Sequence, residues 1–558
     1  MKRVPRIPVA PTAAALLILL AFAFAVAWQI QWPGLYMDAV NPDYLVVDVL
    51  HGVRDAHPIW ILPGNLIAGR FPLLTSLYHG TLQVWLALPF VALFGASVTT
   101  LRIAQAAAGA AILLLMFAWL RRRGGAPAWL AALPVLALAL DPVFVYAFRT
   151  QLYIQLSPVA LLLGAILSGT RALDPSNALP PSSRRRWLFV AGLCFGLSVF
   201  GYFIFAFFAP VLGIALLMAQ RRSGPTRLPW WQTVACSTLG ALIGTMGYWY
   251  GYARIAGAQG GLRGFVDYFA TYQNSLSAFE RHRDVAETLR YFASLIEAVF
   301  SNAWQHSLMF RESWPEPGST LKSLLLLVLP ALLWIVAEMR KRGSGELRLT
   351  LALFASYPIV ALLFGDRLSG HHFVVLLPLA YLALAWGLFG LFPSRSSRLH
   401  AVPTAALGAI LIGINLVGLR ATGAMLSQTH GRGLFSEAIN QFAQDALAAE
   451  TEARPQLYFL PDWGLFMPFH YLTDGRIRHW TDLDPTVVRR ELCGGQSASV
   501  ALVGADAPAR LERLTAQLRW QPPQLRTYTD HEGAPVFSVG RYDAAARTDA
   551  FERCEGVP

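Results

Sequence analysis

Long apolar runs, separated by short arginine-rich stretches, constrain the fold of this 558-residue chain more than any other feature. An α-helix needs about 20 predominantly apolar residues to cross a bilayer, and the runs have roughly that length. With 55% hydrophobic residues and a mean hydropathy of +0.45, the chain is predicted to be an integral membrane protein and not a soluble enzyme. By the length rule we expect about eleven spans, at 9–30, 98–120, 127–146, 153–170, 187–202, 204–220, 232–254, 321–338, 349–365, 372–391 and 402–423.

Basic clusters orient these spans. The formal net charge of +12 comes mainly from arginines, which gather between the apolar runs. Cytoplasmic loops carry such clusters, and alternating the spans from a cytoplasmic N-terminus leaves every cluster inside. The charge therefore indicates contact with anionic lipid and argues against nucleic-acid binding. The clusters are 2–3, 121–123, 184–186, 221–222, 340–342 and the pair Arg395 and Arg398.

Segment 77–94 is apolar enough to span, but hydropathy alone does not decide its orientation. Counting it as a span would move the 121–123 cluster and every later cluster to the outside, against the positive-inside rule. We therefore predict an interfacial helix at 77–94 on the outer face, with Tyr78 and His79 near the lipid headgroups.

The first span is expected to remain as an uncleaved signal anchor. Its apolar region, 9–30, is longer than the hydrophobic region of an ordinary signal peptide. A cleaved signal peptide is the alternative.

The topology divides the chain into a transmembrane domain, 1–424, and an extracytoplasmic domain, 425–558. The final part is more polar, and its pattern predicts a small α/β domain with strands at 456–460, 499–503 and 535–539 and helices at 435–449 and 508–518. The outer face also receives a first outer loop at 31–97 and a second outer loop at 256–320. If the C-terminal domain lies outside the cytoplasm, Cys493 and Cys554 are candidates for a disulfide.

Three carboxylates follow the first span within eleven residues: Asp38, Asp43 and Asp48. Acidic groups at a membrane face are costly unless they are solvated, paired or in use. We expect Asp38 to be a general base whose pKa is raised by burial, with a helix N-cap as the alternative. For Asp43 helix capping is favoured over acceptor binding, and Asp48 is expected to be solvated or paired, with Arg54 as its partner.

Isolated cations on the outer side run against the charge bias, so each needs an explanation. Arg70, Arg149 and Arg367 are candidates to clamp a phosphate, because a guanidinium forks onto phosphate oxygens. Salt bridges to nearby aspartates are the alternative. The functional hypothesis requires the carboxylate of Asp38 and these guanidinium groups to converge in one outward-opening site.

Several short motifs occur in a particular order. In sequence they are Pro33-Gly34-Leu35-Tyr36-Met37-Asp38, Arg70-Phe71-Pro72-Leu73, Phe94-Gly95 followed by Leu101-Arg102, the turn from Arg149 to Gln155, and Arg367-Leu368 through Pro378. Together they resemble the GT-C glycosyltransferases, and most closely the group of protein mannosyltransferases and lipid A aminoarabinose transferases. The chain departs from that pattern where Ala39 replaces a Glu and where Gln155 replaces a second Asp.

The resemblance implies a GT-C fold and a sugar donor carried on a polyprenyl phosphate, with no nucleotide sugar. Asp43, Gln155, His371 and His372 are our candidates to bind the acceptor or the sugar. Adjacent histidines point to different faces of a helix, so we expect at most one of them to line the site. No cofactor is expected; a divalent cation held with Asp38 is the alternative.

We therefore predict an inverting glycosyltransferase in the inner or plasma membrane that acts on a lipid, glycan or protein acceptor at the extracytoplasmic face. A non-catalytic scaffold or receptor with a C-terminal binding domain is one alternative, and a lipid or solute transporter is another. The C-terminal domain is expected either to recognise the acceptor or cover the site, or to be a structural cap.

Overall fold

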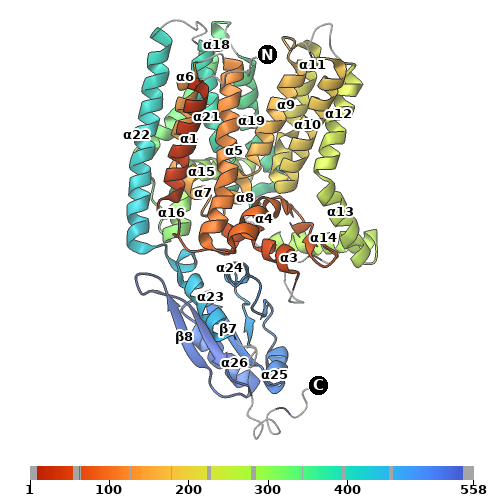
Figure 1. Cartoon of the computed structure of the whole chain (residues 1–558), viewed down its shortest axis with the longest axis vertical. Coiled ribbons are helices and arrows are strands. Elements are labelled where there is room, and N and C mark those ends of the chain that lie inside the picture. The colour runs from red at the N-terminus through yellow and green to blue at the C-terminus, as the bar shows by residue number, and fades with distance from the viewer. Residues whose placement is uncertain are drawn as a thin grey trace, which may run out of the picture.

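A computed structural model describes residues 9–53, 62, 64–124, 127–177, 179–222, 228–277, 284–341, 344–391, 398–450, 456–544 and 554. Figure 1 shows two stacked parts: a bundle of upright helices, and below it a domain that contains a β-sheet. The N-terminus lies at the end of the bundle that faces away from this domain.

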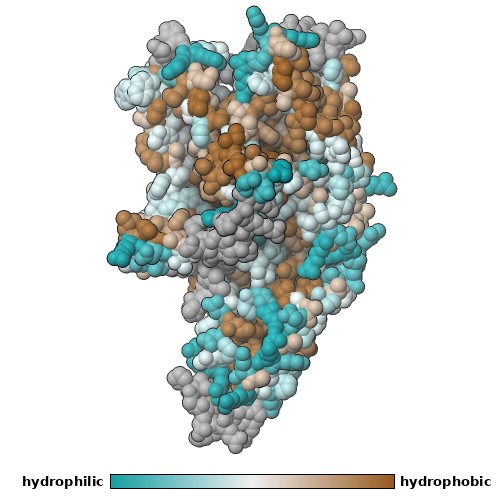
Figure 2. Space-filling model, turned by 180° about the vertical axis from the view of Figure 1, so that it is seen from behind, coloured by the Kyte–Doolittle hydropathy of each residue, from teal (hydrophilic) through white to brown (hydrophobic). Residues whose placement is uncertain are grey.

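Eight helical segments of the described chain are long and apolar enough to cross a membrane: Ala10–Ala27, Val98–Arg122, Tyr153–Leu173, Phe203–Arg222, Ser319–Met339, Gly345–Arg367, Gly370–Gly390 and Ala401–Thr429. The chain is thus a multi-pass membrane protein. Figure 2 shows the expected consequence, because apolar side chains cover much of the outer surface of the bundle and polar ones prevail on the domain below.

The elements that build these segments are α1 (Val9–Ala27), α5 (Val98–Gly124), α8 (Tyr153–Leu156), α9 (Val159–Leu173), η2 (Phe203–Phe208), α11 (Ala209–Arg222), α17 (Ser319–Ser323), η4 (Leu324–Val328), α18 (Leu329–Met339), α19 (Gly345–Ala361), η5 (Leu362–Arg367), α20 (Gly370–Phe373), α21 (Leu376–Leu391) and α22 (Arg398–Thr429). Of the eight segments, the one that contains α21 is the most enclosed, with 89% of its apolar window buried, so it lies at the centre of the bundle.

Three predicted spans are not among the eight. Run 127–146 is divided into α6 (Ala128–Ala139) and α7 (Pro142–Ala147), and run 232–254 into α12 (Trp230–Gly244) and α13 (Met246–Ala258). Run 187–202 belongs to α10 (Pro181–Gly201), whose first turns carry three arginines. Since α10 packs between α9 and α12 in the upright bundle, it belongs to the membrane part (Figure 1). The total of about eleven spans stays a prediction.

The outer end of the bundle carries short elements and lateral helices. In chain order these are α2 (Met37–Val40), η1 (Asp43–Leu45), α3 (Val46–His51), β1 (Leu66–Ile67), β2 (Phe71–Pro72), β3 (Leu74–Ser76), β4 (His79–Gly80), α4 (Leu82–Phe94), α14 (Leu262–Ser277), α15 (Val285–Phe300) and α16 (Ala303–Phe310). The predicted interfacial helix is α4, but it begins at Leu82 and not at residue 77. Residues 74–80 form the antiparallel β3–β4 hairpin instead, and its Gly80 lies so close to Phe200 that a Cβ would fall 2.2 Å from that residue's carbonyl oxygen.

The C-terminal domain runs from η6 (Gly433–Phe435) to β9 (Pro535–Tyr542), with Cys554 beyond. Its five-stranded sheet has the order β6-β5-β7-β9-β8, in which β5 runs parallel to β6 and β7 while β9 runs antiparallel to β7 and β8. The predicted α/β domain is therefore present, and three of its strands match the predicted positions. Its elements are α23 (Ala438–Ala449), β5 (Gln456–Phe459), α24 (Phe466–Leu472), β6 (His479–Trp480), α25 (Pro485–Cys493), β7 (Ser497–Val503), α26 (Ala507–Leu518), β8 (Gln524–Thr529) and β9.

The two parts of the molecule share a hydrophobic core. One apolar cluster joins Met37 and Val46 of the first outer loop to Phe442 of α23 and Phe469 of α24. A second cluster, on the other face of the sheet, is confined to the C-terminal domain and includes Leu511 of α26. The C-terminal domain thus packs directly against the acidic segment and is more than a module tethered by the last span.

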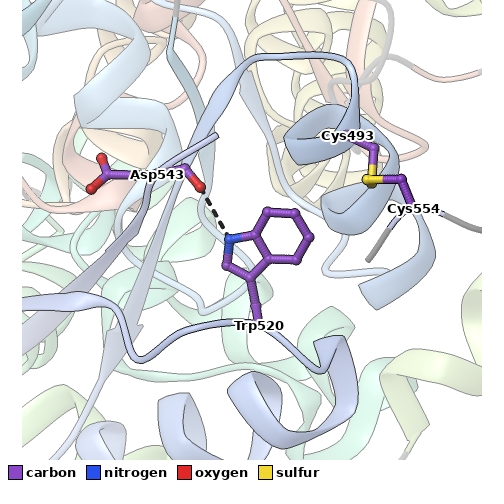
Figure 3. Close-up of a disulfide and its surroundings, with 4 residues drawn as sticks. All are labelled: Cys493, Trp520, Asp543 and Cys554. Carbon is purple, nitrogen blue, oxygen red and sulfur yellow. Dashed lines mark hydrogen bonds between the residues drawn. A yellow bond between two sulfur atoms is a disulfide. The ribbon is translucent and has the colours of Figure 1, made fainter. Parts of the chain in front are cut away.

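A disulfide joins Cys493, at the end of α25, to Cys554 near the C-terminus. Figure 3 shows it near Trp520, whose indole N–H donates to the carbonyl oxygen of Asp543 at 3.0 Å. The pairing that the sequence suggested is present.

Candidate active site

Asp38 lies on α2, just beyond the outer end of α1, and its side chain is half-buried. Its carboxylate makes no hydrogen bond or ion pair within the described part of the chain. Burial raises its pKa to about 7. The side chain also caps no helix, because α2 begins at Met37 with Tyr36 as N-cap. A buried carboxylate with no partner and a pKa near neutrality has the properties of a general base.

Aromatic side chains surround this carboxylate. Its charge acts on Tyr36, Tyr78 and Tyr202. Tyr78 occupies the turn between β3 and β4, and Tyr202 ends α10; their ring centroids lie 6.2 Å apart. Burial raises the pKa of Tyr78, and the charge of Asp38 raises it further. Both phenols therefore stay protonated at neutral pH and are available as hydrogen-bond donors.

His372 joins the group through Tyr202. Its Nε2 lies 3.2 Å from the Tyr202 hydroxyl, and its Nδ1 accepts the backbone N–H of Ser369 at 3.0 Å. Its Nδ1 also lies 3.2 Å from the carbonyl oxygen of Ser369, so both ring nitrogens of His372 have partners.

The turn between α7 and α8 contributes the amide of Gln151, and α8 contributes that of Gln155. Gln155 lies against Tyr202, and Gln151 approaches Nδ1 of His371 at 3.1 Å. The ring centroids of His371 and His372 lie 4.0 Å apart, and the expectation that at most one of them lines the site stays a prediction. We call the set the Asp38 cluster: Asp38, Tyr78, Gln151, Gln155, Tyr202, His371 and His372.

Asp43 is placed differently from Asp38. It is completely buried, and Gln105 Nε2 donates to its Oδ2 at 2.9 Å while Oδ1 has no partner among the described residues. Burial raises its pKa to about 7, with the Gln105 hydrogen bond acting against that shift. Its side chain makes no capping bond, so the favoured capping role is wrong. Asp48 pairs with His470 at 3.0 Å, and its predicted partner Arg54 lies outside the described residues.

Arg149 does not serve as a free cation. It is buried, and it donates to backbone carbonyls around the end of α1, including those of Val26 at 2.5 Å and Gln29 at 3.1 Å. Buried Arg102 does the same for Ile30 and Pro33. These guanidinium groups cap the last turn of α1, where four carbonyls have no helical partner. The structure gives Arg149 this role in place of the predicted phosphate contact.

Arg70 has a similar capping role. It lies between β1 and β2 and donates to the carbonyl oxygens of Val49 and Leu50 at the end of α3. Arg367 is exposed at the end of η5, a few residues before His371. Since burial is the only cause that shifts the pKa of Asp38, no described cation acts strongly on its carboxylate. Arg70 and Arg149 thus bind carbonyl oxygens that end helices, and the convergence of Asp38 with the three guanidinium groups stays a prediction. In the described chain, no group of three possible metal ligands includes Asp38.

The C-terminal domain braces the two residues that precede Asp38. The indole N–H of Trp463 donates to the Tyr36 hydroxyl at 2.7 Å, and the backbone N–H of Gly464 points at the Met37 sulfur at 3.4 Å. Gly464 has φ +111°, and a Cβ there would meet Leu434 at 2.8 Å. Through these contacts, the segment Asp462-Trp463-Gly464 holds the start of α2 in place.

Sequence reasoning missed two groups of residues. Tyr202 and Gln151 belong to the Asp38 cluster, and the only signal for them was their position at predicted outer ends of spans. The second group is a buried ionic network of Asp141, Glu316 and Lys322, in which Lys322 Nζ lies 3.0 Å from Asp141 and 3.8 Å from Glu316. Asp141 lies 181 positions before Lys322, so no local pattern connects it to the other two members.

Comparisons with known proteins identify the fold. No protein-family model matches the chain, and no curated protein sequence matches it. The crystal structure of ArnT from Cupriavidus metallidurans in the apo state aligns with 95% of this chain and 98% of that chain, at 14% identity and a TM-score of 0.54. The crystal structure of ArnT from Cupriavidus metallidurans bound to undecaprenyl phosphate aligns with 96% and 98%, at 16% identity and a TM-score of 0.57. From its first span to its C-terminal sheet, the chain has the GT-C fold of the lipid A aminoarabinose transferase ArnT, as the order of its motifs predicted.

Proposed function

We propose that this protein is an inverting glycosyltransferase that moves a sugar from a polyprenyl-phosphate donor to an acceptor at the extracytoplasmic membrane face. The observation that carries the proposal is the half-buried carboxylate of Asp38, which has a pKa of about 7 and no partner in the described chain. Fold similarity to ArnT supports the donor class, because one of the two ArnT structures is bound to undecaprenyl phosphate.

The chemistry needs a base on the acceptor side. The acceptor oxygen attacks the anomeric carbon, its proton passes to the Asp38 carboxylate, and the bond from that carbon to the lipid phosphate oxygen breaks. Attack from the face opposite the leaving group inverts the anomeric centre. A carboxylate with a pKa near 7 is basic enough to accept the proton and is ionised often enough to act.

The other members of the Asp38 cluster suit sugar binding. Tyr202, His372 and Gln155 offer donors and acceptors in a partly dry setting, where such hydrogen bonds are stronger than in water. Asp43 is assigned to acceptor or sugar binding through its unpaired Oδ1. Its full burial makes a direct proton-transfer role less suitable than that of Asp38.

Arg367 is the phosphate ligand in this proposal. It is exposed at the end of η5 and lies four residues before His371. A guanidinium at that position can fork onto the phosphate oxygens as negative charge develops on the leaving group.

The C-terminal domain is assigned to the extracytoplasmic side, the periplasm in a two-membrane cell. The disulfide between Cys493 and Cys554 supports this, because structural disulfides persist in oxidising compartments. Whole cells treated with a membrane-impermeant reductant and then with an impermeant maleimide should label these two cysteines. Labelling only after the membrane is permeabilised would contradict the assignment.

The function is tested with purified protein and a panel of polyprenyl-phosphate sugars, by measuring release of the lipid phosphate. Wild type should release it from at least one donor when an acceptor is present, and Asp38→Asn should not. Asp482→Asn, an exposed carboxylate of the C-terminal domain, is the matched control and should behave like wild type. Equal release by wild type and Asp38→Asn would remove the base assignment, and no release from any donor would favour the scaffold.

The phosphate assignment has its own pair of variants. Arg367→Gln should weaken donor binding and raise KM. Arg70→Gln, which removes an exposed cation of the same face, should leave KM for the donor nearly unchanged.

A further inference from the structure

Two histidines and a glutamate meet where the membrane bundle joins the C-terminal domain. His430 follows α22, Glu437 precedes α23, and His531 lies in the turn between β8 and β9. Each offers one ligand atom, and the three atoms lie within 4.8 Å of one another. His430 Nδ1 is 3.3 Å and His531 Nδ1 is 3.8 Å from the same oxygen, Oε1 of Glu437.

Stacking holds the two imidazoles in this arrangement. The ring of His430 lies 3.8 Å from that of Trp32 and 3.7 Å from that of His531, measured between centroids. Trp32 comes from the first outer loop, so the stack spans three separate stretches of chain. A ring nitrogen binds a metal ion in the plane of its own ring, so one of the two stacked rings turns when an ion binds both.

The positive charge beside the group is neutralised. Arg432 forms ion pairs with Glu532 and Glu312, and its guanidinium is therefore not paired with the Glu437 carboxylate. Those ion pairs also hold the β8–β9 turn, and with it His531, against the end of the membrane bundle.

The types of ligand atom in this group indicate which metal ion it would bind. Zinc binds imidazole nitrogen and carboxylate oxygen at about 2.0–2.2 Å, which places neighbouring ligands of a tetrahedral site about 3.3 Å apart. The separations of 3.3 and 3.8 Å between the histidine nitrogens and the Glu437 oxygen are close to that value. Calcium and magnesium prefer sets made of oxygen alone. Because His531 is exposed, a fourth position is open to water.

We propose that His430, Glu437 and His531 bind a divalent metal ion such as zinc. The ion holds the C-terminal domain against the end of α22. The site is separate from the Asp38 cluster, and the proposal does not rest on the transferase function. The ion fixes the β8–β9 turn against the chain that leaves the membrane, and thereby stabilises the packing of the domain against the first outer loop.

The test uses the full-length protein in detergent, stripped with EDTA and titrated with zinc sulfate alone. Wild type should bind about one zinc ion per chain by elemental analysis. Glu437→Gln keeps the shape of the side chain and should weaken the affinity by at least about 100-fold, since loss of a mere second-shell partner costs 10–100-fold. His531→Ala should do the same.

His51→Ala is the matched control. It removes another imidazole between the first outer loop and the C-terminal domain, where it pairs with Asp474 at 3.2 Å. It should bind zinc like wild type, and zinc should raise the melting temperature of both but not that of Glu437→Gln. Wild type that binds no zinc, or Glu437→Gln that binds it as tightly as wild type, would overturn the proposal.

Discussion

The Asp38 cluster and the buried ionic network handle buried charge in opposite ways. In the network every charged group has partners: Lys322 lies 3.0 Å from Asp141, the Tyr381 hydroxyl donates to Asp141 at 2.8 Å, and the Asn302 amide donates to Glu316 at 2.6 Å. In the cluster the carboxylate of Asp38 has none within the described chain. Burial raises the pKa of both Asp38 and Glu316 to about 7. For Glu316, however, Lys322 and two hydrogen bonds act against that shift.

The difference distinguishes charged residues that stabilise the fold from those that form a functional site. A buried charge that stabilises a fold is paired, because an unpaired one costs several kcal/mol. A buried charge without a partner lowers stability, and such groups are found mainly at functional sites. The network joins the start of α7, the start of α17 and, through Tyr381, α21. The cluster lies at the end of the bundle that faces the C-terminal domain.

Removal of the Asp38 carboxylate should give the largest effect. We expect Asp38→Asn to lower the transfer rate by about 10²–10⁴-fold, the usual contribution of a general base. Because the lost carboxylate has no partner, the protein should stay folded with an unchanged or higher melting temperature. A variant that unfolds would show that Asp38 is paired after all, and the contrast with the network would fail.

Breaking the network should instead destabilise the protein. Lys322→Met leaves two buried carboxylates without their cation, and removing one partner of a buried pair costs about 3–5 kcal/mol. The measurement is thermal or denaturant unfolding of the purified protein. Arg348→Gln, which breaks an exposed pair with Glu338, is the control and should cost at most about 1 kcal/mol. Equal losses in the two variants would contradict the structural role of the network.

The pH dependence sharpens the comparison. Because Asp38 must be ionised to accept a proton, kcat/KM should fall about tenfold per pH unit below pH 7. The folded protein holds a proton on Asp38 that the unfolded chain has lost between about pH 4 and 7. Stability should therefore decrease as pH rises through that window and level off above it. Asp38→Asn should remove this share of the decrease, and an identical stability profile would argue against the raised pKa.

Weakening the contact between the C-terminal domain and α2 should give the smallest effect. Trp463→Phe removes the hydrogen bond to Tyr36, which contributes about 0.5–1.5 kcal/mol at most and less at an exposed indole. We expect kcat to fall a few-fold while KM for the donor changes little. Trp520→Phe is the control, because its indole donates to Asp543 on the far side of the domain (Figure 3). If the two variants have equal activity, the C-terminal domain does not position Asp38.

Some of the site was readable from local pattern. Asp38, His371 and His372 were singled out because each is polar at the outer end of an apolar run, and all three belong to one cluster. Arg70 and Arg149 were singled out for the same reason, but they donate to the carbonyls that end α3 and α1. An arginine at the end of an apolar run looks the same in sequence whether it binds phosphate or caps a helix. Only the three-dimensional positions of its neighbours show which role it has.

The sequence by itself determined many membrane-crossing helices, a small α/β domain at the end and the order of motifs typical of a GT-C fold, while the orientation of the helices stays a prediction from charge. These properties depend on a bilayer of fixed thickness and on charge bias, both of which act on contiguous residues. Tertiary packing decided the pairing of Lys322 with two carboxylates, the core shared by Met37 and Phe442, and the meeting of His430 with His531. Such contacts join residues tens to hundreds of positions apart, and no periodicity in the chain encodes which apolar face will cover which other.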